Sequence, residues 1–103
     1  DQEMVLTKNE MIIFQLLLAN REKIVSRDEI MTDLWDNDEF VNDNALTVNI
    51  SRLRGKLADL GYDDAIETRK KQGYRLVSGI IYHLQRQKIG VIWQNEIWLV
   101  YKG

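Results

Sequence analysis

Residues 44–60 carry polar and basic side chains where an amphipathic helix would present them to solvent. Leu46, Ile50, Leu53 and Leu57 recur at helical steps of three and four, so they would share one buried stripe. The outer face would then hold Asn44, Val48, Ser51, Arg52 and Gly55, flanked by Thr47 and Arg54. Asn, Ser, Thr and Arg side chains hydrogen-bond base edges and phosphates, and an exposed Val can pack on a thymine methyl group. This face predicts contact with double-stranded DNA.

A short basic segment follows this helix. Residues 66–76 contain two β-prone runs around Arg69-Lys70-Lys71-Gln72-Gly73 and predict a β-hairpin with a basic turn. Arg69, Lys70 and Lys71 offer positive charge that suits the enhanced negative potential of a narrow groove. A helix followed by a basic hairpin indicates a recognition helix and a wing. The alternatives are an ordinary amphipathic surface helix and a lysine run that is only a solvated face.

The charge of the chain is unevenly distributed. Its formal net charge is -2, which by itself argues against nucleic acid. Residues 28–43, however, hold seven acidic side chains and no Lys or Arg, whereas residues 52–56 hold three basic side chains and residues 69–75 hold four. Because the Debye length is roughly 8 Å at physiological salt, a phosphate backbone responds mainly to the local basic patch. Net charge therefore does not exclude DNA.

Composition argues against other functions. A length of 103 residues predicts one domain, residues 1–103. The chain has no cysteine, a single histidine (His83) and no Gly-rich phosphate loop, so we expect no enzyme activity, no metal or other cofactor and no small-molecule substrate. It also lacks a run of about 18 apolar residues and a signal-peptide pattern. We therefore expect no membrane span and a cytoplasmic location.

Two capping patterns predict the first two helices. Thr7 is followed three residues later by Glu10, and Ser26 by Glu29, and each pair can satisfy two free backbone donors at a helix start. The first helix should end near Asn20. Residues 24–25 form a possible short strand, and the second helix should extend through residue 35.

An acidic loop, residues 36–43, precedes the third helix, which Asn42 or Asp43 should cap and Gly61 should end. The order of helix, helix, loop, helix and hairpin predicts an α+β winged helix-turn-helix fold. Its elements would be three helices, an antiparallel sheet and a β-hairpin wing.

Several motifs in this chain resemble one bacterial family. They are Leu6-Thr7-Lys8-Asn9-Glu10, Val25-Ser26-Arg27-Asp28-Glu29-Ile30, Leu34-Trp35, Leu46-Thr47-Val48-Asn49-Ile50-Ser51-Arg52-Leu53-Arg54-Gly55-Lys56-Leu57, Ile66-Glu67-Thr68 and Gly73-Tyr74-Arg75-Leu76. As a set they closely resemble the effector domain of OmpR/PhoB-type response regulators of two-component systems, over residues 4–77. The segment Asp43-Asn44-Ala45-Leu46-Thr47-Val48-Asn49 looks most like the Gram-positive subgroup that responds to envelope stress and antimicrobial peptides.

The resemblance implies how the chain would meet DNA to regulate transcription. The recognition helix, residues 44–60, would lie in the major groove, and the wing, residues 66–76, would approach the adjacent minor groove or its phosphates. Arg52 is the best candidate for a base contact, because a guanidinium can bridge O6 and N7 of guanine. Around it lie Asn44, Thr47, Val48 and Ser51. Side chains nearer the edge of the exposed face, or at the start of the wing, are expected to contact phosphates: Asn49, Arg54 and Thr68.

The resemblance also implies protein partners. In this family the loop between the second and third helices contacts RNA polymerase, so Asp36, Asp38 and Glu39 are expected polymerase contacts, with simple solvation as the alternative. Family members bind direct repeats, so we expect copies that are monomeric in solution and pair head to tail on DNA. Trp35 is predicted to be a core residue, although the matching aromatic in the family also touches the DNA backbone. Lys71 stands where the family often has a glycine.

One departure from the family concerns the order of the strands. In the family an antiparallel sheet of four strands precedes the first helix, but here only one strand, residues 3–6, has room to exist. Three β-prone runs occur instead after the wing: residues 80–84, 88–93 and 96–101. The last two are separated by Gln94-Asn95, which suits a tight hairpin.

This strand pattern predicts a circularly permuted domain. Residues 1–77 would hold the last sheet strand, the helices and the wing, and residues 80–103 would supply the strands that come first in the family. Residues 96–101 would then pair antiparallel with residues 3–6, and Lys102 would lie within about 7 Å of Gln2. The alternative is a native tail rich in β-strand residues.

A protein-interaction module is the competing function, because a winged helix can dock a partner through the same face. The two functions differ in their response to salt. Binding through phosphates weakens steeply as salt rises and persists on random duplex at low salt.

Overall fold

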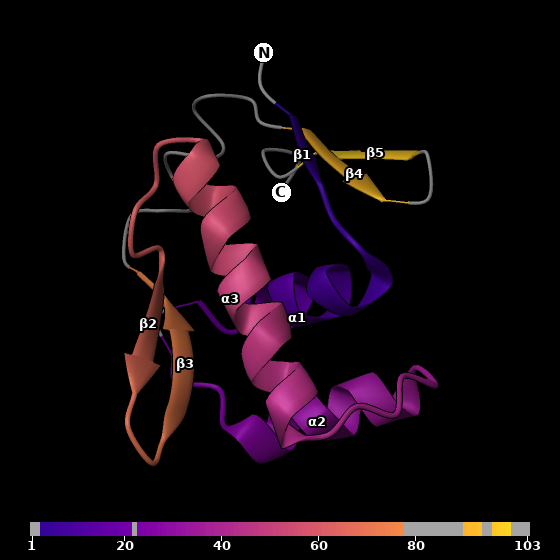
Figure 1. Cartoon of the computed structure of the whole chain (residues 1–103), viewed down its shortest axis with the longest axis vertical. Helices are drawn as coiled ribbons and strands as arrows, with labels where there is room; N and C mark the ends of the chain where they lie inside the picture. The colour runs from indigo at the N-terminus through magenta and orange to yellow at the C-terminus, as the bar shows by residue number, and fades with distance from the viewer. Residues whose placement is uncertain (1–2, 22, 78–89, 94–95, 100–103) are drawn as a thin grey trace.

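The computed structural model describes residues 3–21, 23–77, 90–93 and 96–99. Its elements are β1 (Glu3–Val5), α1 (Lys8–Ala19), α2 (Arg27–Asp36), α3 (Asp43–Asp59), β2 (Ile66–Arg69), β3 (Gly73–Leu76), β4 (Gly90–Trp93) and β5 (Glu96–Leu99). Figure 1 shows α3 crossing α1, with the β2–β3 hairpin beside α3. The small sheet of β1, β4 and β5 lies at the opposite end of the molecule from α2. Three helices followed by a hairpin confirm the predicted winged helix-turn-helix arrangement.

Both predicted capping boxes are present. The Thr7 backbone N–H donates to the Glu10 carboxylate at 2.9 Å, and the Glu10 N–H donates back to the Thr7 hydroxyl at 3.3 Å. Ser26 and Glu29 form the same reciprocal pair at the start of α2. A cap of this kind typically stabilises a helix by about 1 kcal/mol. The starts of α1 and α2 are thus fixed by local sequence.

The ends of α3 also follow local sequence. The Asn42 side chain accepts from the Ala45 N–H at 2.8 Å and caps the helix. At the other end Gly61 has a φ of 97° and donates to the carbonyl of Ala58, while Tyr62 donates to that of Leu57. This pair of hydrogen bonds is a Schellman motif, and its left-handed residue favours glycine.

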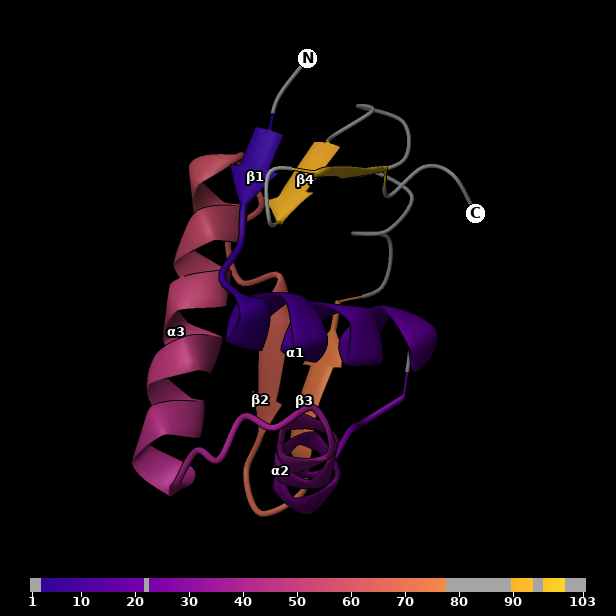
Figure 2. The ribbon, with the colours of Figure 1, turned by 90° about the vertical axis from the view of Figure 1, so that its right-hand side faces the viewer.

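The predicted apolar stripe of α3 is buried against α1. Leu46, Leu53 and Leu57 are fully buried and Ile50 is 2% exposed. In Figure 2, α1 lies beside α3 and in front of the β2–β3 hairpin, with α2 below. Among the charged residues described, Glu10 is buried, and it forms an ion pair with Lys56 of α3. The helix that would face DNA is therefore held by apolar packing and by one ion pair to α1.

Backbone pairing attaches the wing to the helices. Val25 donates to the Tyr74 carbonyl at 2.8 Å and accepts from the Tyr74 N–H at 2.9 Å, which makes the short strand expected near residue 25 an isolated β-bridge. Gly73 has a φ of 145°, and a Cβ there would lie 2.0 Å from the Val25 carbonyl oxygen. This approach is open only to glycine.

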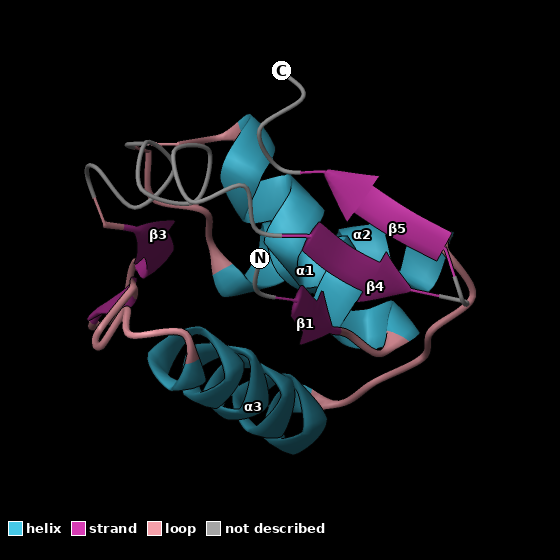
Figure 3. Cartoon of the chain, turned by 90° about the horizontal axis from the view of Figure 1, so that it is seen from above, coloured by secondary structure: helices cyan, strands magenta, loops and turns pink. Residues whose placement is uncertain are grey.

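The small sheet has a strand order that differs from the prediction. β4 lies between β1 and β5 (Figure 3). β4 and β5 are antiparallel with Trp93 opposite Glu96, so the predicted hairpin with a two-residue connection is confirmed. β1 pairs with β4, in parallel, and not with β5. The antiparallel pairing of residues 96–101 with residues 3–6, which the permuted order predicts, is therefore wrong.

Burial and connectivity explain this order. Met4 and Val91 face each other in the β1–β4 register and are 3% and 1% exposed, so β1 and β4 both contribute a side chain to the core. Parallel strands require a long crossover, and the helices and wing lie between β1 and β4 in the chain. A tight turn imposes antiparallel pairing, as between β4 and β5. The predicted strand at residues 80–84 and the turn from Lys102 to Gln2 lie outside the described residues.

Two glycine substitutions should change stability in opposite directions. Gly73→Ala should destabilise the domain by about 2 kcal/mol or more, because it combines strain at a positive φ with a clash against Val25. Gly55→Ala is the matched control, since nothing lies within 4 Å of the added Cβ and Ala is preferred in a helix by about 0.5–1 kcal/mol. Urea unfolding of both variants measures the difference. Equal shifts in the two variants would contradict this account of Gly73.

Candidate nucleic-acid interface

The outer face of α3 presents most of the predicted DNA contacts to solvent. Asn44, Thr47, Ser51 and Arg52 are exposed, and Val48 is 44% exposed. The Arg52 side chain forms no hydrogen bond or ion pair with any other residue that the structure describes. Its guanidinium is therefore free to bind a planar bidentate acceptor.

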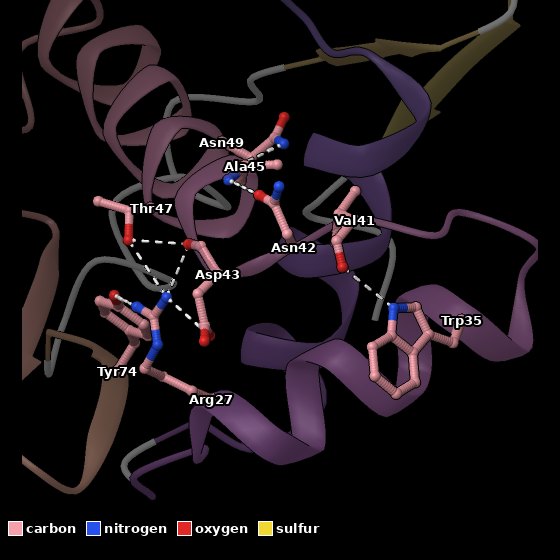
Figure 4. Close-up of polar contacts among 9 residues, drawn as sticks. All are labelled: Arg27, Trp35, Val41, Asn42, Asp43, Ala45, Thr47, Asn49 and Tyr74. Atoms are coloured by element: carbon pink, nitrogen blue, oxygen red, sulfur yellow. Dashed lines mark hydrogen bonds and ion pairs between the residues drawn. The ribbon is translucent and has the colours of Figure 1, made fainter.

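Asn49 does not lie on this face. Its side chain is 8% exposed, and its amide donates to the Ala45 carbonyl at 2.8 Å (Figure 4). Asn49 is three residues after Leu46 and four before Leu53, so it borders the apolar stripe and is covered with it. The prediction that Asn49 lies at the edge of the exposed face is wrong, and its amide instead bonds the backbone of α3.

Arg54 and Thr68 lie together where the helix meets the wing. The Arg54 guanidinium donates to the Thr68 hydroxyl at 2.8 Å and to the Ile66 carbonyl at 3.1 Å. The alternative partner for Arg54, a surface acid, is not used within the described part of the chain. These two bonds join α3 to β2, and Arg54 keeps its positive charge uncompensated at the junction.

Some cations of the wing form ion pairs with an acidic side chain, and others do not. Glu67 lies between Arg69 at 2.5 Å and Arg75 at 2.6 Å. The hydrogen bond from Arg75 is the main cause that lowers the pKa of Glu67, and Arg69 adds to it. Lys70 and Lys71 are exposed and pair with no acid among the described residues. The free charge of the wing is therefore at its tip.

The tip is a tight turn. Gln72 donates to the Arg69 carbonyl at 2.9 Å, and Lys71 has a φ of 66°. A positive φ at the third residue of a four-residue turn normally selects glycine or asparagine. Lys71 thus adopts a conformation that favours glycine, the residue that the resemblance leads us to expect here, and adds a cation.

Arg27 is a residue of this interface that sequence reasoning did not identify. Its guanidinium donates to the Tyr74 hydroxyl at 2.5 Å, to the Asp43 carbonyl at 2.8 Å and to the Thr47 hydroxyl at 3.2 Å (Figure 4). One signal was available in the sequence. Arg27 is the first residue of α2, where the helix dipole disfavours a cation, so an arginine there suggests a specific partner.

A cavity of about 400 Å³ lies between the start of α2 and the wing. Its lining comes from residues 26–28 and 68–74, and it includes Arg27, Lys70 and Lys71. Basic side chains on two sides of a cavity attract anions. The wing thus lies between this basic cavity and the outer face of α3. A basic surface of this kind is expected to bind a polyanion.

Trp35 is not a core residue, and that prediction is wrong. It is 49% exposed, and its indole N–H donates to the Val41 carbonyl at 3.1 Å (Figure 4). The core side of α2 is formed by Ile30, Met31 and Leu34. Trp35 follows Leu34 directly, so it is rotated about 100° away from that side and lies over the loop that leads to α3.

The acidic loop between α2 and α3 is a compact turn. Asp36 and Asp38 are exposed, whereas Glu39 pairs with Lys8 of α1 at 3.4 Å. Lys8 also donates to the Asn37 carbonyl at 3.0 Å, and Asp38 has a φ of 63°. Two of the three predicted polymerase contacts are therefore free, and the third is engaged with α1.

The described part of the chain offers neither a membrane span nor a metal site. No helix described is long and apolar enough to cross a bilayer. No cluster of three or more His, Asp or Glu side chains able to hold a metal ion occurs among the described residues.

The sequence of residues 1–76 matches a family model described as "Transcriptional regulatory protein, C terminal". This chain belongs to that family, and its fold is the winged-helix DNA-binding fold of response-regulator output domains. The family consists of transcription regulators and not of enzymes. The predicted family is thereby confirmed.

Similar proteins have been described in staphylococci. The response regulator protein GraR of Staphylococcus aureus is 54% identical over 74 residues, and GraR of Staphylococcus saprophyticus is 51% identical over 74 residues. Each match covers 72% of this chain and 33% of the relative. The chain thus spans about one third of the length of these relatives.

Two solved structures share the fold. The C-terminal domain of NsrR, a lantibiotic response regulator described as the nisin resistance regulator, is 38% identical with a TM-score of 0.63, and the match covers 69% of this chain and 72% of that domain. The DNA-binding domain of Escherichia coli CadC is 28% identical with a TM-score of 0.62, covering 70% and 68%. The similarity to GraR and NsrR agrees with the subgroup that the sequence predicts.

The Glu67 ion pairs should stabilise the domain in a pH-dependent way. Because the pKa of Glu67 is lower in the folded chain than its ordinary value of 4.5, the stabilisation should be complete above that value and disappear as the pH falls through the folded pKa. Glu67→Gln removes the negative charge and keeps nearly the same side-chain shape. The difference in unfolding free energy between parent and variant, measured by urea titration from pH 7 to pH 3, should shrink below pH 4.5. A difference that stays constant with pH would contradict the assignment.

Proposed function

We propose that this chain binds double-stranded DNA sequence-specifically in the bacterial cytoplasm, as the output domain of a two-component response regulator. The recognition helix α3 would enter the major groove, and the wing would lie at the adjacent minor groove. The observation that carries the proposal is Arg52, an unpaired and exposed guanidinium at the centre of a face whose other side chains are also able to contact bases.

The chemistry of each side chain suggests its role. Arg52 would bridge O6 and N7 of a guanine, contributing roughly 1–3 kcal/mol of discrimination. Neighbouring base contacts would come from Asn44, Thr47, Val48 and Ser51. Phosphate contacts would come from Arg54, Thr68, Lys70 and Lys71. Arg69 would attract a phosphate less strongly, because its charge is already paired with Glu67.

Substitutions at the helix and at the wing should have different effects. Arg52→Ala should weaken specific binding and relax the preference at one base pair, because it removes a base contact. Lys70→Ala should weaken binding to all duplexes equally and lower the salt slope by about one unit, because it removes a phosphate contact. Fluorescence anisotropy with the selected operator and with random duplex, each over a salt series, measures both effects.

Lys23→Ala is the matched control for charge. Lys23 is exposed and belongs to the segment between α1 and α2 rather than to α3 or the wing, so its loss removes a positive charge from neither proposed binding element and should leave both the affinity and the salt slope unchanged. If the Arg52 and Lys70 variants bind every duplex as tightly as the parent, α3 and the wing are not the binding surface. If the parent binds no duplex even at low salt, the protein-interaction function is favoured instead.

We also propose that copies of the domain pair head to tail on direct repeats. What supports this is the similarity to response regulators together with an interface whose two parts, helix and wing, are different in kind, so that one copy covers one half-site. The free domain should be monomeric at micromolar concentration, and two copies should bind a two-repeat duplex cooperatively. Light scattering and titration of one-repeat and two-repeat duplexes test this. A stable dimer without DNA would contradict it.

A contact with RNA polymerase through the α2–α3 loop is a further part of the proposal. Asp36 at the end of α2 and Asp38 on the loop support it, because they are exposed carboxylates and would suit a basic surface. Glu39 is a weaker candidate, because its carboxylate already pairs with Lys8.

A further inference from the structure

We propose that Arg27 is a positioning residue: it fixes the start of α3 relative to the wing, and so controls sequence preference without contacting a base. This inference rests on the proposed DNA-binding function. It starts from an arginine whose side chain contacts two elements besides the helix that carries it.

The contacts of Arg27 span three elements. From the first turn of α2, one terminal nitrogen donates to the Tyr74 hydroxyl of β3. The other terminal nitrogen donates to the carbonyl and carboxylate of Asp43 and to the Thr47 hydroxyl, all in the first turns of α3. The guanidinium carbon also lies 5.9 Å from the centre of the Tyr74 ring. Figure 4 shows the guanidinium between Tyr74 on one side and the start of α3 on the other.

The geometry of these contacts requires arginine. Two different nitrogens of one planar group bond acceptors on opposite sides, so the distance between β3 and α3 is fixed by the rigid guanidinium fork. A lysine has a single ammonium at the end of a flexible stem and would not reproduce both sets of bonds. Tyr74 is only 6% exposed, so its hydroxyl is held in place by the wing and gives Arg27 a firm partner.

The connection has a direct effect on the binding face. Thr47, a candidate base contact, donates its hydroxyl proton to the Asp43 carbonyl at 3.2 Å and accepts from Arg27, so its rotamer is set by these bonds. Arg54 and Thr68 connect α3 to the wing at a second point, farther along the helix. The apolar stripe holds α3 against α1, and these two polar connections set its position relative to the wing. Loss of Arg27 should therefore let the start of α3 shift relative to the wing while the helix stays packed.

A binding experiment separates positioning from direct contact. Arg27→Gln should lower the ratio of specific to random-duplex affinity by roughly tenfold, as expected for about one or two lost hydrogen bonds, and leave the salt slope unchanged. Arg27→Lys should not restore the ratio. A salt slope that falls by about one unit with an unchanged ratio would show that Arg27 contacts a phosphate, and it would overturn the proposal. Lys23→Gln is the control for the lost charge.

Tyr74→Phe provides a milder test, because it removes only the hydroxyl that accepts from Arg27. It should also lower the ratio of specific to random-duplex affinity. Combined with Arg27→Gln it should cause little further loss, since both changes break the same connection. Losses that add in the double variant would overturn the proposal. Thermal unfolding of each variant shows whether it is folded at the temperature of the binding assay.

A measurement without DNA tests the positioning role of Arg27 separately from DNA binding. The chain has no cysteine, so spin labels can be placed at Ser51→Cys on α3 and Gln72→Cys on the wing. The distribution of distances between the labels should broaden with Arg27→Gln and stay unchanged with Lys23→Gln. An unchanged distribution in the Arg27 variant would overturn the positioning role even if the parent binds DNA. If the distance distribution broadens with Arg27→Gln but the parent binds no DNA, the positioning role is supported and the proposed function is refuted.

Discussion

The proposed binding surface depends on the backbone pairing between Val25 and Tyr74. Two hydrogen bonds join the wing to the segment before α2, and they form only because Gly73 has no Cβ to meet the Val25 carbonyl. The pairing places Tyr74 beside the first residue of α2, where Arg27 can reach it. A hairpin without this anchor would lose its backbone attachment to the segment before α2 and keep only side-chain connections such as that of Arg54 to Thr68. Helix and wing can bind one duplex together only if their relative position is already set, because ordering them at the moment of binding would cost affinity.

The distribution of partners explains how an acidic chain presents a basic surface. Lys56 pairs with Glu10, and both Arg69 and Arg75 pair with Glu67, so these cations contribute to structure more than to the external field. The remaining cations of the interface, Arg52, Arg54, Lys70 and Lys71, have no acidic partner among the described residues. Of the acidic residues of α2 and its loop, Asp28 lines the same cavity as Lys70 and Lys71, whereas Glu39 pairs with Lys8 of α1. At physiological salt the effect of charges farther away than roughly 8 Å is screened at the basic face.

Local rules in the sequence predicted local structure well. The capping boxes, the apolar stripe of α3 and the hairpin turn are each determined by residues within a few positions of one another, so helix starts and the wing were predicted closely. The errors concern packing. Asn49 and Trp35 each lie at the border between a buried and an exposed face, where periodicity alone cannot decide burial. The order of β1, β4 and β5 depends on contacts between distant segments, and strand propensity does not specify which strand pairs with which.

Two residues near the wing depart from local preference, and both departures place a cation at the interface. Arg27 stands at a helix N-terminus, where its charge opposes the dipole, and Lys71 adopts a left-handed conformation that favours glycine. Each is locally unfavourable by up to about 1–2 kcal/mol. Natural sequences are otherwise locally consistent, so departures of this kind tend to mark functional positions. Both residues line the cavity between α2 and the wing, one anchoring the wing to α3 and the other extending a free charge from its tip. The locally unfavourable free energy of these two residues is thus found at the cavity between α2 and the wing, where we propose that one residue positions α3 and the other binds DNA.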